Sequence, residues 1–121
     1  MNDATPSRLL LLAMGGTIAG RAIDATSLNR YSAGVITAEE LLQSVPQLKQ
    51  FAEIEVEQIA NVDSADLTFA HWQRLVVQVR SALAADSDLT GVVITHGTNT
   101  LEETAWLLQL LIDDSRPVVL V

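Results

Sequence analysis

An unbroken apolar run at residues 9–14, ended by two glycines, constrains the fold of this chain more than any other feature. The run reads Leu-Leu-Leu-Leu-Ala-Met and lacks the alternation of a strand with one wet face. It therefore predicts a strand that is covered on both faces, as strands of parallel sheets are. A run of this length is too short for the apolar core of a signal peptide or for a membrane span.

Three later segments also read as strands. Residues 91–95, which are apolar up to Thr95, and residues 117–121, which are fully apolar, predict two more buried strands. Residues 53–57 alternate Glu with Ile and Val, which predicts a strand with one wet face near a sheet edge. Because the last apolar run needs helices from later sequence to cover it, we expect the natural protein to continue beyond residue 121.

Helices are predicted between these strands. Trp72, Leu75, Val76, Val79 and Leu83 form one apolar stripe at helical spacing. Two capping-box patterns, which begin at threonines 37 and 100, predict the starts of two further helices. The alternation of strands with helices predicts an α/β fold with a doubly wound, largely parallel sheet flanked by helices.

The segment between the first strand and the first helix is polar and irregular. Residues 21–34 contain Gly and Asn and show little periodicity, so we expect a mobile loop or an irregular hairpin. With 121 residues and 49% hydrophobic content, the chain is long enough for one domain and too short for two. We expect residues 1–121 to form an incomplete N-terminal α/β domain.

Charge and composition exclude several classes of partner. The net charge is -8, with 7 Lys and Arg against 15 Asp and Glu, so neither nucleic acid nor a membrane surface is expected as a partner. There are no cysteines, and His71 and His96 stand apart, so we expect no metal and no cofactor. Residues 1–8 are not basic and apolar like a leader, so we expect a cytoplasmic protein, or a periplasmic one if a signal peptide has been removed.

The predicted ligand site lies at the strand exits. In open α/β sheets, ligands bind beyond the carboxyl ends of the strands, which here are residues 15–17, 61–66 and 96–100. Gly15 and Gly16 allow a sharp turn and bring backbone N–H groups close to a ligand, with Thr17 at the pocket mouth. This is the geometry of an attacking alcohol beside an oxyanion hole, although Gly-Gly-Thr alone is more often a simple turn.

Two rival interpretations fit the sequence less well. A dinucleotide fingerprint requires glycine in place of Thr17, and a phosphate-binding P-loop requires Lys and then Ser or Thr after Gly20, where Arg21 and Ala22 occur. His96 in a strand exit more often satisfies a backbone hydrogen bond than it binds a metal, and no Gly-x-Ser-x-Gly elbow is present.

Four runs together resemble the bacterial type II-like L-asparaginases. They span most of the chain, in order: Leu-Leu-Ala-Met-Gly-Gly-Thr-Ile-Ala-Gly (11–20), Val-Pro-Gln-Leu-Lys (45–49), Asn-Val-Asp-Ser-Ala-Asp (61–66) and Thr-His-Gly-Thr-Asn-Thr-Leu-Glu-Glu-Thr-Ala (95–105). The resemblance implies an amidohydrolase that converts L-asparagine, and in some members L-glutamine, to the acid and ammonia. It also implies a homotetramer of two-domain subunits, with sites built between paired subunits.

The resemblance assigns roles to particular residues. Thr17 is the expected nucleophile, and Tyr31 is expected to assist proton transfer at Thr17. Ser64 is expected to hold the substrate α-carboxylate, and Thr98 is the second catalytic threonine, next to Asn99. Further substrate contacts are expected from Gly16, Ala65 and Gly97. The family's catalytic Lys comes from later sequence and its Glu from a neighbouring subunit, so residues 1–121 alone are expected to be inactive.

Two positions depart from the family pattern. Ala65 stands where the family has Gln, which removes a donor for the substrate carboxylate. Asn99 stands where the family has the Asp that pairs with the substrate ammonium and orients the Lys. Exchanging a charge-assisted hydrogen bond for a neutral one costs about 1–2 kcal/mol, or about 5–30-fold in rate. These departures leave open a non-catalytic amino-acid-binding protein on the same fold.

Overall fold

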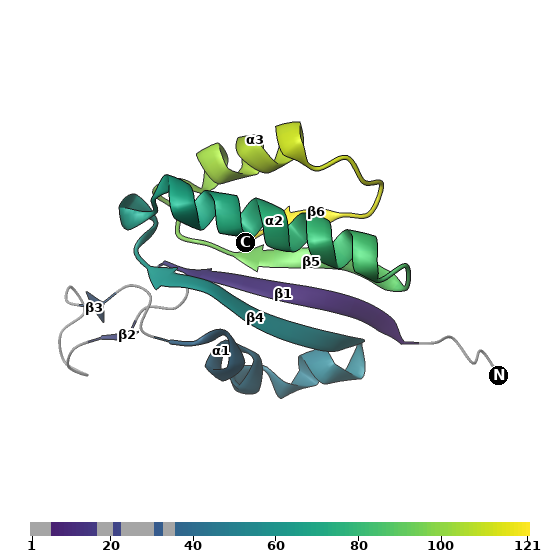
Figure 1. Ribbon diagram of the computed structural model, residues 1–121. Helices are drawn as coiled ribbons and strands as arrows, with labels where there is room; N and C mark the ends of the chain where they lie inside the picture. The colour runs from purple at the N-terminus through teal and green to yellow at the C-terminus, as the bar shows by residue number, and fades with distance from the viewer. Residues whose placement is uncertain (1–5, 17–20, 23–30, 33–35) are drawn as a thin grey trace.

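The fold is built on one parallel sheet. The computed structural model describes residues 6–16, 21–22, 31–32 and 36–121. The sheet has the strand order β4-β1-β5-β6, and every neighbouring pair is parallel (Figure 1). Its strands are β1 (Ser7–Gly15), β4 (Ala52–Val62), β5 (Leu89–Thr95) and β6 (Val118–Leu120). This arrangement confirms the predicted α/β fold with a parallel sheet.

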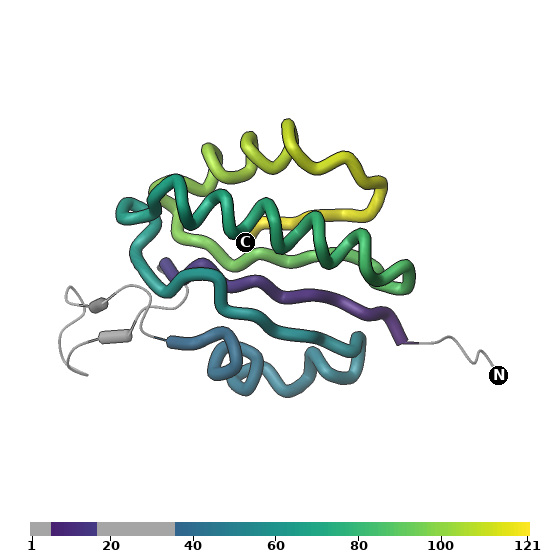
Figure 2. The backbone as a smooth tube through the Cα atoms, viewed as in Figure 1, coloured from purple at the N-terminus to yellow at the C-terminus, as the bar shows by residue number. Residues whose placement is uncertain are grey.

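Helices lie on both faces of the sheet. Figures 1 and 2 show α2 (Phe69–Ala85) and α3 (Leu101–Leu111) on one side, with α1 (Ala38–Ser44) and the 3-10 turn η2 (Pro46–Gln50) on the other. A second 3-10 turn, η3 (Ser64–Asp66), follows β4. In the described part of the chain, no helix is long and apolar enough to cross a membrane.

The core lies between the sheet and α2. Alternate residues of β1 point toward this helix, so Leu10, Leu12 and Met14 are buried, with Leu12 fully inaccessible. The predicted stripe of α2 meets them, and its Leu75 and Val79 are also inaccessible. Burial of these apolar side chains stabilises the sheet.

Several local predictions are confirmed. Thr37 caps α1, since its hydroxyl accepts from the backbone N–H of Glu40 while the Glu40 carboxylate accepts from the backbone N–H of Thr37 at 2.8 Å. β4 lies at the sheet edge as predicted, although it is longer than the predicted 53–57 because it pairs with β1 along most of that strand. Its end, Val62, pairs with Gly15 across a register shift.

The polar segment after β1 contains a short hairpin ladder. β2 (Arg21–Ala22) pairs antiparallel with β3 (Tyr31–Ser32), which fits the hairpin alternative. The residues that would join these strands, 23–30, lie outside the described part of the chain, as do residues 17–20.

The capping box predicted at Thr100 is wrong. Thr100 does precede α3, but its side chain makes no capping hydrogen bond to that helix. Instead the Thr100 hydroxyl donates to the carbonyl oxygen of Ser64 at 3.0 Å. The Thr100 hydroxyl therefore bonds to an acceptor that is distant in sequence and does not cap its own helix. A local sequence pattern cannot reveal such a partner.

Candidate active site at the strand exits

Three strand exits meet at one edge of the sheet. β4, β1 and β5 are neighbours and run parallel, so their carboxyl ends lie side by side. The backbone N–H of Gly16, just past β1, donates to the carbonyl oxygen of Val62 at 2.8 Å. The backbone N–H of Asn99, past β5, donates to Ser64 Oγ, past β4, at 3.1 Å. The exits are thus joined to one another directly.

Glycines allow the exits of β1 and β5 to touch. Gly15 and Gly16 have φ angles of +94° and +84°, which residues other than glycine rarely adopt. A Cβ added to Gly97 would lie 3.1 Å from the Cα of Gly16 and 2.7 Å from Ser64 Oγ. A Cβ on Gly16 would overlap the backbone of Gly97. Gly16, Gly97 and Ser64 therefore form one tightly packed junction.

Ser64 lies at the centre of this junction. It is only 2% exposed, its Oγ accepts the Asn99 N–H, and its carbonyl accepts the Thr100 hydroxyl. Among the residues that the structure describes, nothing accepts the hydrogen of its hydroxyl. A buried hydroxyl with an unused hydrogen can donate to an anionic oxygen of a ligand.

Asp63 and Asn99 form a side-chain pair beside Ser64. Asp63 Oδ1 accepts from the backbone N–H of Ala65 at 2.8 Å and from Asn99 Nδ2 at 3.0 Å. The first of these bonds caps η3. The pair places a carboxylate next to Asn99, whereas the sequence pattern predicts only a turn at Asp63.

A buried hydrogen-bond network supports the exit of β5. His96, 2% exposed, lies 2.7 Å from the Gly97 carbonyl through Nδ1 and 2.8 Å from Thr104 Oγ1 through Nε2. The indole N–H of Trp72 donates to the same Thr104 oxygen at 2.8 Å. Because a carbonyl only accepts, Nδ1 carries a hydrogen in the contact with Gly97. The expected structural role of His96 is confirmed.

The predicted site residues are partly described. Six of them lie at the same edge of the sheet: Gly16, Ser64, Ala65, Gly97, Thr98 and Asn99. Thr98 is exposed beside the buried Gly97. Thr17 lies outside the described residues, and of Tyr31 only the backbone, in β3, is described.

Sequence reasoning missed three contributors to this edge. Asp63 could have been found from its position between a strand exit and Ser64. Trp72 and Thr104 were not predicted as partners of His96, because their contact joins two helices and a loop that are distant in sequence.

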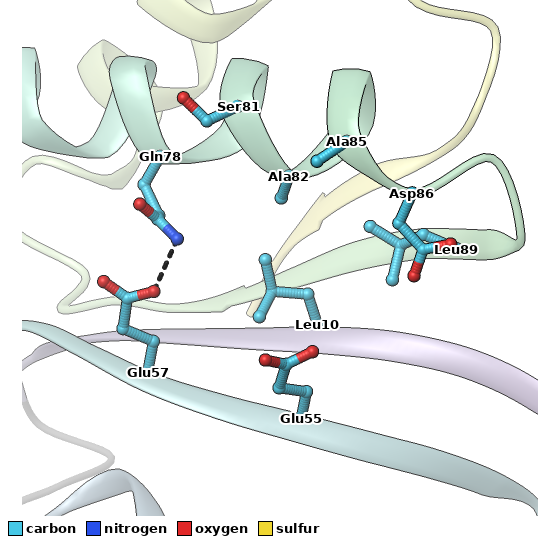
Figure 3. A pocket seen from close by; sticks show the side chains of 9 residues that line it. All are labelled: Leu10, Glu55, Glu57, Gln78, Ser81, Ala82, Ala85, Asp86 and Leu89. Atoms are coloured by element: carbon cyan, nitrogen blue, oxygen red, sulfur yellow. Dashed lines mark hydrogen bonds between the residues drawn. The ribbon is translucent and has the colours of Figure 1, made fainter.

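A separate cavity lies at the opposite end of the sheet. It has a volume of about 290 Å³ and lies between α2 and the early parts of β1 and β4, as Figure 3 shows. Glu55, Glu57 and Asp86 contribute carboxylates to it, and Glu57 accepts from Gln78 Nε2 at 2.5 Å. In the described ranges, no group of three His, Cys, Asp or Glu residues could hold a metal ion.

Comparison with known proteins gives a consistent result. The family described as "Asparaginase, N-terminal" matches residues 8–121. The chain is 44% identical to L-asparaginase 2 of Bacillus subtilis over 92% of this chain and 29% of that protein. It is 42% identical to the glutaminase-asparaginase of Pseudomonas aeruginosa over 95% of this chain and 32% of that protein.

A solved structure shares the fold. The crystal structure of a probable cytoplasmic L-asparaginase from Campylobacter jejuni superposes with a TM-score of 0.88 at 44% identity, covering 94% of this chain and 34% of that one. The chain spans about a third of the length of these relatives, from 29% to 34%. It belongs to the asparaginase family, whose N-terminal domain it matches.

Proposed function

We propose that the protein containing this chain is an amidohydrolase that converts L-asparagine to L-aspartate and ammonia. The single observation that carries this proposal is the junction of Gly16, Gly97 and Ser64, which brings three strand exits together. Thr17, the proposed nucleophile, follows Gly16 directly in the sequence. The names of the relatives, L-asparaginase and glutaminase-asparaginase, support the same substrate class.

The proposed reaction passes through an acyl-enzyme. The Thr17 hydroxyl attacks the carbonyl carbon of the side-chain amide, the C–N bond breaks, and the hydroxyl proton leaves with ammonia. Water then attacks the ester and frees aspartate and Thr17. Tyr31 and Thr98 assist proton transfer, and backbone N–H groups near Gly16 and Gly97 stabilise the developing oxyanion.

Parts of the protein outside residues 1–121 are expected to complete the site. We infer that the complete protein has a second domain and a catalytic lysine in its later sequence, and that a neighbouring subunit contributes a glutamate to the site. The active form is then a homotetramer, and residues 1–121 alone are inactive. The site requires no metal or cofactor. L-glutamine is the second substrate to test, because Ala65 lacks the amide of the expected Gln.

The test is ammonia release by the complete protein. L-Asparagine is expected to yield equimolar aspartate and ammonia, and Thr17→Ala is expected to abolish the reaction. Thr17→Ser, which keeps a hydroxyl, is the matched control and should retain part of the rate. Full activity of the alanine variant would refute the role of Thr17, and no ammonia from any amide would refute the proposed function.

A second candidate is an amino-acid-binding protein without catalysis. The hydrogen bond between Asn99 Nδ2 and Asp63 favours it, because an amide stands where the family has a carboxylate. Calorimetry would support this candidate if the complete protein bound aspartate tightly while releasing no ammonia.

A further inference from the structure

The two carboxylate oxygens of Asp63 differ in their hydrogen bonds to the described residues. Its Oδ1 holds the Ala65 N–H at 2.8 Å and the Asn99 amide at 3.0 Å. Its Oδ2 accepts no hydrogen bond within the described part of the chain. The residue is partly buried, so water only partly surrounds this carboxylate oxygen.

Asp63 and Ser64 both contact Asn99. The Asp63 side chain contacts the side chain of Asn99, and the Ser64 side chain contacts the backbone N–H of Asn99. Asn99 therefore links the Asp63 carboxylate to the Ser64 hydroxyl through two hydrogen bonds. The result is an anionic acceptor beside a hydroxyl donor.

This pairing of groups matches the head of an α-amino acid. An α-amino acid carries an ammonium and a carboxylate on one carbon atom, so the groups that bind them must lie within a few ångströms of each other. Ser64 Oγ–H suits the carboxylate, and Asp63 Oδ2 suits the ammonium. The Asn99 side-chain oxygen, whose amide nitrogen is turned to Asp63, adds a neutral acceptor for the ammonium.

We propose that Asp63 binds the α-ammonium of the substrate and thereby makes the site specific for α-amino acid amides. The proposal rests on the proposed function and adds a residue that determines specificity. It explains how a site with the neutral Asn99 keeps a negative charge. The Asp63 carboxylate, at the exit of β4, accepts a hydrogen bond from the Asn99 side chain. Asp63 is a binding residue here and takes no part in bond breaking.

The first test compares two ligands that differ only in the ammonium. Calorimetry on the complete protein measures L-aspartate and succinate, which lacks the amino group. Asp63→Asn keeps the acceptor for the Ala65 N–H and removes the charge. It is expected to weaken aspartate binding about tenfold while succinate changes less than about threefold. Asp66→Asn, with the same charge change on the exposed end of η3, should leave both affinities unchanged.

The second test moves the negative charge from Asp63 to the position of Asn99. In the double variant Asp63→Asn with Asn99→Asp, donor and acceptor of the pair exchange and one carboxylate remains. Aspartate affinity is expected to return to within about threefold of the parent. Asn99→Asp alone should give a smaller gain than it gives in the Asp63→Asn background, because it places two carboxylates in contact.

Two results would overturn the proposal. An equal loss of aspartate and succinate binding in Asp63→Asn would show that Asp63 only supports the turn. Equal effects of Asn99→Asp in both backgrounds would show that Asp63 does not provide the charge. In both cases ammonia release by the parent would leave the proposed function intact, whereas a parent that neither binds aspartate nor releases ammonia refutes both.

Discussion

The backbones of Gly16 and Gly97 lie against each other where β1 and β5 end, and a methyl group on Gly97 would come within 3.1 Å of the Gly16 Cα. The same methyl would lie 2.8 Å from Ser64 Cβ, closer than real Cβ atoms come to their neighbours. The contact links three segments that are distant in sequence. Close packing at this edge of the sheet therefore requires glycine at both Gly16 and Gly97.

Gly97→Ala is expected to destabilise the protein. Overpacking a tight junction of backbone atoms costs about 1–3 kcal/mol. Urea unfolding of the complete protein measures this cost. Combining the change with Ser64→Gly removes two of the three nearest atoms, so the double variant should lose less than the sum of the single losses. A Gly97→Ala protein within about 0.5 kcal/mol of the parent would contradict the packing.

Thr104→Val is expected to destabilise the network behind the β5 exit. Thr104 is fully buried, and its hydroxyl serves both the Trp72 indole and His96. Valine keeps the shape and leaves Trp72 Nε1 and His96 Nε2 without their partner, at about 1–3 kcal/mol for each unsatisfied group. Thr104→Ser is the control, since it keeps the hydroxyl and loses one methyl. If the serine variant unfolded as easily as the valine variant, packing and not hydrogen bonding would explain the effect.

The salt bridge between Asp114 and Arg116 predicts a pH dependence of stability. Arg116 donates to the Asp86 carbonyl at 2.7 Å and to the Leu83 carbonyl, which ties the C-terminus of α2 to the segment before β6. Its side-chain hydrogen bond lowers the pKa of Asp114 from 3.8 to about 2. Because the folded-state pKa is the lower one, this stabilisation is complete above the ordinary pKa and is lost as pH falls toward 2.

Asp114→Asn should therefore lower Tm at pH 6 and have a smaller effect at pH 2.5. The effect is modest because Asp114 is exposed and salt screens it. Asp113→Asn, which alters the neighbouring exposed carboxylate, is the control. Thermal unfolding followed by circular dichroism measures both variants. An equal Tm difference between Asp114→Asn and the parent at the two pH values would contradict the assigned interaction.

Most of the fold could be predicted from local patterns. The unbroken run at residues 9–14 predicts the central strand β1, since burial on both faces removes any alternation. The stripe from Trp72 to Leu83 predicts α2, since its spacing places these side chains on one face. Both signals arise within a single segment, so neither needs knowledge of the tertiary structure.

The site was predictable in position but not in detail. Parallel strands must end at a shared edge, so the exits holding Ser64 and Gly97 could be placed together. The Thr100 hydroxyl was assigned to a helix cap, yet it bonds to the Ser64 carbonyl, because tertiary partners compete with local ones. The Asp63 contact with Asn99 joins residues 36 positions apart, and no local pattern contains it.

The most direct test compares two threonines at opposite ends of β5. Thr98 follows the strand at the proposed site, whereas Thr90 lies near its start and accepts from the Arg8 N–H at 3.3 Å. For the complete protein, Thr98→Ala is expected to lower kcat/KM for L-asparagine by about 10²–10⁴-fold, the range for loss of a proton-transfer group. Thr90→Ala should stay within about threefold of the parent. Equal rates for the two variants would contradict an active site at the strand exits.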